Sequence, residues 1–295
     1  MHSFLDRVTV KSTALVLGKK KFFRSSIGSP GYRTLLEEAE LEMPSIKKEG
    51  IYELKANNSA ALLDPAFDLV QWKGDHFPTI IYHHGNNEKP FKYKAWEKNS
   101  FYKIFNPRKG ELEVNLFNLR APFHQSFNLY LEKIADLNQF LSMLTTSTRL
   151  IQELVDFSRE KGSSHIMVCG ISLGAWVANL HRAFYNSADS YVPLLGGPKP
   201  ADIFLDSSYA QLVDPSVFNH REEIEKRLNF TEEFSSHQEK NIFPLLALYD
   251  QFIRYDVQKD AYKPHSVAAI YRGHTTGFLA GKALREHVEK ILTRG

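Results

Sequence analysis

Ser172 stands between two glycines, Gly170 and Gly174, in a G-x-S-x-G pattern. The apolar residues 166–169 precede this pattern, and the small or apolar residues 175–180 follow it. This order predicts a strand, a sharp turn and a helix, which is the arrangement of a nucleophile elbow. In such a turn the strand and the helix lie so close that a Cβ atom at either glycine would clash, and the serine adopts a strained positive φ. The pattern therefore predicts that Ser172 Oγ points into a cleft as a nucleophile.

In this context the pattern resembles the nucleophile elbow of the α/β-hydrolase superfamily, and the resemblance covers the chain from about Gly50 to its end. It implies a three-layer α/β/α sandwich around a mostly parallel, eight-stranded sheet, with a helical lid insertion. Proteins of this superfamily carry serine, then Asp or Glu, then histidine along the chain. The resemblance therefore implies an acid and a histidine downstream of Ser172, and an oxyanion-hole turn upstream of it.

Three histidines, His265, His274 and His287, lie downstream of the candidate acids. His265 precedes the apolar residues 267–271, at the amino-terminal edge of a predicted strand, whereas parallel sheets bind ligands beyond their carboxyl edge. His287 lies within an amphipathic helical pattern and is expected on the helix surface. His274 directly follows the predicted strand, and the resemblance implies that it is the catalytic histidine.

The acid should end the preceding strand, and the apolar residues 242–249 stop at Asp250. The resemblance therefore implies that Asp250 orients His274. Asp256 is the alternative acid if the loop after this strand is longer. Without a catalytic role, Asp250 would cap a turn, for which its side chain is well suited.

The oxyanion turn should follow a buried strand, and the apolar residues 79–83 run into a His-Gly-Asn-Asn sequence. This sequence resembles the family's HG turn. Gly85 would let the backbone approach the substrate, and the N–H of Asn86 would bind the oxyanion together with the N–H of Leu173. Asn87 is the alternative donor to Asn86.

His83 and His84 could instead be metal ligands, but adjacent residues of a strand point to opposite faces. No cluster of carboxylates or cysteines accompanies the two histidines in the sequence. We therefore expect neither a metal ion nor an organic cofactor.

Several apolar residues indicate a hydrophobic pocket for an acyl group. Phe123 and His124 follow the predicted strand 113–119, and Phe204 lies in residues 198–240, which lack strand character and predict a helical lid. The resemblance implies a serine hydrolase that acts on a small-molecule acyl substrate, with a carboxylic ester as the first choice. Thioesterase, peptidase and acyltransferase activities use the same chemistry, and the superfamily also contains non-catalytic scaffold proteins.

The chain divides into an expected helical N-terminal extension, residues 1–48, and a hydrolase domain, residues 49–295. Strands are predicted at 51–55 and 67–72, as an antiparallel edge pair if the superfamily pattern holds, and at 191–195. Residues 129–160 show helical spacing that the polar residues 145–148 interrupt.

Composition is that of an enzyme-sized globular chain: 295 residues, of which 43% are hydrophobic. The 37 Lys and Arg residues are spread among 34 Asp and Glu residues, so nucleic acid is not an expected partner. No apolar run approaches the length of a membrane span or a signal peptide. Cys169 is the only cysteine, which favours a reducing compartment, and we expect a cytoplasmic protein. The sequence leaves the oligomeric state open.

Overall fold

The computed structural model describes residues 2–18, 20–58 and 61–294. Its main sheet has eight strands in the spatial order β11-β10-β9-β8-β6-β7-β5-β2. All neighbours from β7 to β11 are parallel, and β5 runs antiparallel to both β7 and β2. The predicted mostly parallel sheet is therefore confirmed. The strands are β2 (Gly50–Glu53), β5 (Ala66–Gln71), β6 (Thr79–His83), β7 (Asn115–Arg120), β8 (Ile166–Ile171), β9 (Ser190–Leu194), β10 (Leu245–Ala247) and β11 (Ala268–Ile270).

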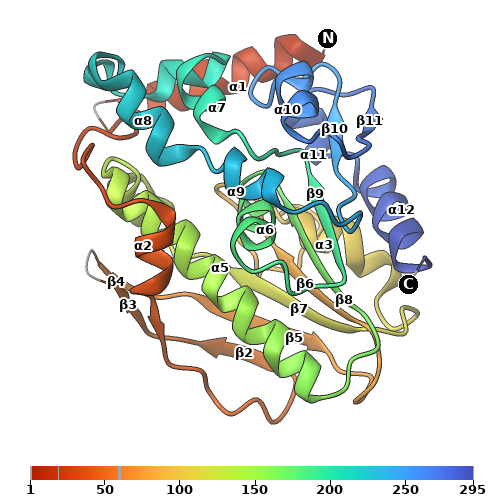
Figure 1. The fold of residues 1–295 in the computed structure, drawn as a ribbon. Coiled ribbons are helices and arrows are strands. Elements are labelled where there is room, and N and C mark those ends of the chain that lie inside the picture. Colours follow the sequence, from red (N-terminus) through yellow and green to blue (C-terminus); the bar gives the residue numbers. More distant parts are fainter. Residues whose placement is uncertain (1, 19, 59–60, 295) are drawn as a thin grey trace.

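The edge strand β2 pairs with β5 in antiparallel register, with Gly50 opposite Leu69, as expected. The chain between these two strands does not form a simple turn. It contains β3 (Ala56–Asn58) and β4 (Ala61–Leu63), which join β1 (Glu40–Leu41) in a separate three-stranded sheet. This small sheet extends the edge of the molecule away from the central strands (Figure 1).

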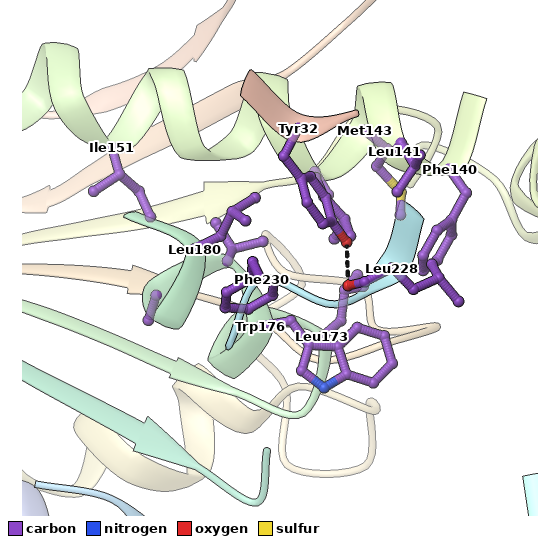
Figure 2. Packing of buried hydrophobic residues seen from close by; sticks show 14 of the residues in the cluster. Tyr32, Phe140, Leu141, Met143, Ile151, Leu173, Trp176, Leu180, Leu228 and Phe230 are labelled. Atoms are coloured by element: carbon purple, nitrogen blue, oxygen red, sulfur yellow. Dashed lines mark hydrogen bonds between the residues drawn. The ribbon is translucent and has the colours of Figure 1, made fainter. Parts of the chain in front are cut away.

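Helices cover both faces of the main sheet (Figure 1). One face carries α2 (Tyr32–Glu37), α5 (Leu137–Glu160), α6 (Leu173–Phe184) and α9 (Thr231–Ser236), and the other carries α3 (Ser100–Phe105) and α12 (Gly281–Leu292). Because both faces are covered, every residue of β6, β8 and β9 is buried. Figure 2 shows the first layer, where Tyr32 donates a hydrogen bond to the Leu228 carbonyl above the elbow helix α6.

The predicted interruption at residues 145–148 is wrong, because α5 runs through them without a break. Thr145 Oγ1 donates to the Leu141 carbonyl over 3.0 Å, and Thr148 Oγ1 donates to the Leu144 carbonyl over 2.9 Å. These bonds satisfy the buried hydroxyls within the helix itself. The preceding helix, α4 (Phe127–Lys133), is separate, and Asp136 caps the start of α5.

Short helices gather beyond the carboxyl edge of the sheet (Figure 1). They are α7 (Pro200–Leu205), η2 (Ser208–Leu212), η3 (Pro215–His220), α8 (Arg221–Leu228), α10 (Tyr255–Ala261) and α11 (His274–Phe278). A further short helix, η1 (Asn106–Arg108), directly follows α3 and does not belong to this group. The N-terminal helix α1 (His2–Leu17) contacts η2 and α11. Residues 198–240 are thus largely helical, but the boundary at residue 48 and the mobility of a lid stay predictions.

Candidate active site

The turn between β8 and α6 holds Ser172 at φ 54° and ψ −109°, a conformation that non-glycine residues rarely adopt. Its backbone N–H donates to the Leu194 carbonyl over 2.8 Å, which ties the turn to β9. A Cβ atom at Gly170 would collide with the Gly174 carbonyl, and one at Gly174 would collide with the His83 carbonyl. Both glycines are therefore required by the close approach of the strand and the helix.

Ser172, His274 and Asp250 form one chain of hydrogen bonds. Ser172 Oγ lies 3.0 Å from His274 Nε2, and His274 Nδ1 lies 2.7 Å from Asp250 Oδ2. Because the carboxylate accepts from Nδ1–H, the Nε2 atom is left to accept from the serine hydroxyl. The other carboxylate oxygen accepts the N–H groups of Phe252 and Ile253, each over 2.8 Å, which fixes Asp250.

The charges around His274 favour its protonated form. Burial alone would lower the pKa of His274, but the charge and hydrogen bond of Asp250 and the charge of Asp6 raise it above 6.5. Lys98 acts in the opposite direction. The imidazole can thus accept a proton and hold it beside a carboxylate, which general base catalysis requires.

The alternative acid, Asp256, and the two other downstream histidines do not join this chain of hydrogen bonds in the described residues. Asp256 is exposed in the first turn of α10, and in the described chain no hydrogen bond or ion pair joins it to His274. His265 Nε2 lies 3.4 Å from Arg182, and His287 Nε2 bonds the Phe243 carbonyl over 2.9 Å. The structure therefore brings Asp250 to the histidine and leaves Asp256 away from it.

The turn after β6 is fixed from two sides. Gly85 donates its N–H to Glu88 Oε1 over 2.5 Å, and the Glu88 carboxylate also accepts from the backbone N–H and the hydroxyl of Ser100. On the other side, His84 Nδ1 donates to the Gly85 carbonyl over 2.6 Å and His84 Nε2 accepts from the Ala121 N–H over 3.0 Å. Burial lowers the pKa of His84 well below 6.5, in agreement with this neutral tautomer.

Of the two expected oxyanion donors, Asn86 lines the same cavity as Ser172, and Leu173 directly follows the serine in the chain. The Asn86 side chain donates to the Tyr209 hydroxyl over 3.1 Å, and its carbonyl accepts from Lys98 Nζ over 3.0 Å. Leu173 is the first residue of α6, so its N–H has no acceptor within the helix. Asn87, the alternative donor, has a positive φ of 56°.

His83 and His84 do not point to opposite faces, and that expectation is wrong. Their rings stack with centroids 4.9 Å apart, because β6 ends at His83 and the chain turns at His84. Each Nδ1 atom bonds a backbone carbonyl, and burial lowers the pKa of His83 to about 4. The pair thus acts as neutral packing beneath the turn. Within residues 2–18, 20–58 and 61–294 no group of three or more His, Cys, Asp or Glu side chains could hold a metal ion.

A cavity of about 560 Å³ opens beside Ser172 and His274. Its wall comes from α1, the loop after β6, α4, α6, the segment after Gly197, and helix α11, which begins at His274. Most lining side chains are apolar or aromatic: Leu17, Phe22, Ala95, Trp96, Phe127, Tyr130, Leu131, Ile134, Trp176, Ile203, Tyr209, Phe252, Ile253, Phe278 and Leu279. The cavity can therefore take up an apolar group next to the serine hydroxyl.

Of the four expected substrate-binding residues, only Gly85 lines this cavity. Phe204 points from α7 into an aromatic cluster, with its ring 4.8 Å from Phe23 and 5.7 Å from Trp176. Phe123 is buried, and its N–H donates to Asp64 over 2.9 Å. His124 packs against the rings of His84 and Tyr130. Phe204 and His124 contact rings that line the cavity, but none of these three residues lines it, so the structure does not support their expected direct contact with substrate.

The sequence did not indicate that the N-terminal helix reaches the site. Thr9 and Thr13 of α1 line the cavity, and the buried Asp6 bonds the backbone of His274. No local pattern could have revealed these contacts, because the partners lie 268 residues apart in the chain. Glu88 was missed as well, although a carboxylate three residues after Gly85 is a pattern that can close a turn.

No helix of the described residues has the length and apolar character needed to cross a membrane. No family model and no curated protein matches the sequence.

Solved structures share its fold at low sequence identity. Est1E from Butyrivibrio proteoclasticus matches with a TM-score of 0.53 and 13% identity, over 82% of this chain and 99% of its own. An acetyl xylan esterase from Paenibacillus sp. R4 matches with a TM-score of 0.52 and 11% identity, over 88% of this chain and 92% of its own. Pyrococcus horikoshii acylaminoacyl peptidase matches with a TM-score of 0.53 and 15% identity, over 85% of this chain but only 41% of its own length. With its sheet order and serine turn, the chain has the α/β-hydrolase fold.

Proposed function

We propose that this protein is a serine hydrolase that cleaves an acyl bond, with a carboxylic ester as the leading substrate class. The observation that carries the proposal is the unbroken hydrogen-bond chain from Ser172 through His274 to Asp250 at the wall of an apolar cavity. A scaffold protein has no need of a strained serine turn kept in line with a buried histidine and acid.

In the proposed mechanism, Ser172 Oγ attacks the acyl carbon while His274 Nε2 takes the hydroxyl proton. Asp250 stabilises the resulting imidazolium, and the N–H groups of Leu173 and Asn86 bind the oxyanion. The tetrahedral intermediate collapses, the bond to the leaving alcohol breaks, and His274 gives the proton to that alcohol. Water then repeats the attack on the acyl-enzyme with His274 as base, which releases the acid and frees Ser172.

The apolar wall supports an acyl group with hydrocarbon character rather than a charged one. Esters, thioesters and amides are all cleaved by such triads and differ in the leaving group. We prefer the ester because an alkoxide is a better leaving group than the nitrogen anion of an amide, so its departure depends less on the proton that His274 supplies.

A panel of p-nitrophenyl esters, acyl thioesters and anilides of increasing acyl length tests the proposal. We expect ester hydrolysis by the wild type and a loss of several orders of magnitude in kcat for Ser172→Ala, with an unchanged melting temperature. Faster turnover of anilides than of matched esters would indicate a peptidase. No turnover in any class would favour a scaffold.

A further inference from the structure

Asp6 of the N-terminal helix α1 joins the start of helix α11, which carries the proposed base, to the loop that carries the proposed acid. Its Oδ2 atom accepts the N–H of His274 over 2.8 Å and the N–H of Gln251 over 3.2 Å. Its Oδ1 atom accepts the N–H of Thr275 over 2.9 Å. Gln251 directly follows Asp250, so one carboxylate holds both the backbone of the histidine and the backbone next to its acid.

Neighbouring contacts make this junction close and specific. Asp6 is fully buried, and His2 Nδ1 lies 2.9 Å from the Thr276 hydroxyl on the same helix α11. A Cβ atom at Gly273 would come within 2.6 Å of Asp6 Oδ2 and 3.1 Å of the His2 carbonyl. The backbone before His274 thus has room for α1 only because residue 273 is glycine.

We propose that Asp6 is a positioning residue for the proposed hydrolysis. It holds the start of α11, which carries His274, and the Asp250 loop in register, so that the imidazole bridges Asp250 and Ser172. This role rests on the proposed function. Removal of this buried carboxylate would leave three N–H groups without an acceptor. The start of α11 and the Asp250 loop would then lose their common anchor. A displacement of the base of about 1 Å costs about 10²-fold in rate.

The charge of Asp6 supplies a readout that a purely structural role would not move. The charged groups that face His274 are Asp250, Asp6 and Lys98, and the two carboxylates raise its pKa while Lys98 lowers it. Neutralising residue 6 should therefore lower the pKa of His274. Because the base must be neutral to act, the acidic limb of kcat/KM should move to lower pH even as kcat falls.

The test compares Asp6→Asn with Asp256→Asn, a matched change at an exposed carboxylate, using a short p-nitrophenyl ester. For Asp6→Asn we expect kcat to fall by about 10- to 100-fold, with a smaller change in KM and an acidic limb at lower pH. Asp256→Asn should keep the wild-type profile. Gly273→Ala, whose methyl group would displace Asp6, should reproduce both changes, and combining it with Asp6→Asn should add little further loss.

A wild-type kcat and pH profile for folded Asp6→Asn would overturn the inference, and so would additive losses in the double variant. If circular dichroism shows that Asp6→Asn does not fold, Gly273→Ala alone is the test. A Gly273→Ala variant with the same pH profile as the wild type would then overturn the inference. Ser172→Ala separates the two claims: if it stays as active as the wild type, the proposed function fails instead.

Discussion

Glu88 Oε1 accepts the backbone N–H of Gly85 over 2.5 Å, from a position where the carboxylate is almost completely buried. The same carboxylate reaches the start of α3 through Ser100, whose hydroxyl also accepts from Tyr82 over 2.6 Å. A buried acid thus fixes the turn that carries Asn86. Its protonation couples that turn to pH.

Glu88 should make the fold less stable as pH rises. Burial raises its pKa from 4.5 to about 7, although Ser100 and Gly85 oppose the shift with hydrogen bonds. The folded chain therefore binds more protons than the unfolded chain between these values, and the free energy of unfolding should fall by about 3 kcal/mol as pH rises through this window. Glu88→Gln should abolish that fall in urea titrations at pH 4.5 to 8, whereas the exposed Glu132→Gln should retain it. Equal pH slopes for both variants would contradict this prediction.

The activity should be lost below neutral pH. The net effect of Asp250 and Asp6 raises the pKa of His274 despite its burial, so the protonated, inactive imidazolium persists to higher pH than in an ordinary histidine. We expect kcat/KM for a short ester to fall below an apparent pKa above 6.5. A profile that stays flat down to pH 5 would show that His274 does not titrate as the base.

Asp250→Asn should depress kcat by up to about 10⁴-fold, because an amide cannot hold the imidazole in the required tautomer. Asp256→Asn should change kcat less than about twofold, since its side chain is exposed and does not reach His274. Steady-state kinetics on both folded variants provide the measurement. The reverse ranking would assign the acid to Asp256.

Ile203 and Phe204 are neighbours on α7 with different surroundings, and their substitutions should differ in kind. Ile203 lines the cavity, whereas Phe204 packs against Phe22, Phe23 and Trp176. Phe204→Ala should cost about 3–5 kcal/mol of unfolding free energy and leave the ratio of kcat/KM between long and short esters unchanged. Ile203→Ala should lower the preference for long over short esters by about 10- to 200-fold, which corresponds to about 1–3 kcal/mol. An unchanged ratio for Ile203→Ala would place the acyl group elsewhere.

Local patterns predicted the serine turn and the strands, because a strand or an elbow is encoded by neighbouring residues. The order of serine, acid and histidine followed from the resemblance to the superfamily. Asp250 stands where an apolar run ends, which is the position that the resemblance gives to the acid. The misplaced residues all depend on which way a side chain turns after its strand or helix is formed. Phe204 lies on the predicted helix, yet it faces an aromatic cluster, and Ile203 one residue earlier faces the cavity.

Contacts between distant segments could not be predicted at all. Nothing near Asp6 in the sequence indicates that its carboxylate meets the N–H of His274, and nothing near Thr9 places it at the cavity. The cytoplasmic location expected from the single cysteine stays a prediction, as do the domain boundary and the movement of residues 198–240.

Covalent labelling by a fluorophosphonate shows whether Ser172 is a nucleophile. Wild-type protein, Ser172→Ala and Asp250→Asn are each incubated with a fluorophosphonate probe and followed by intact-mass spectrometry, with peptide mapping of any adduct. We expect one adduct on the wild type, located at Ser172, slower formation on Asp250→Asn, and none on Ser172→Ala. Equal labelling of the wild type and Ser172→Ala, or a wild type that does not react, would contradict this expectation.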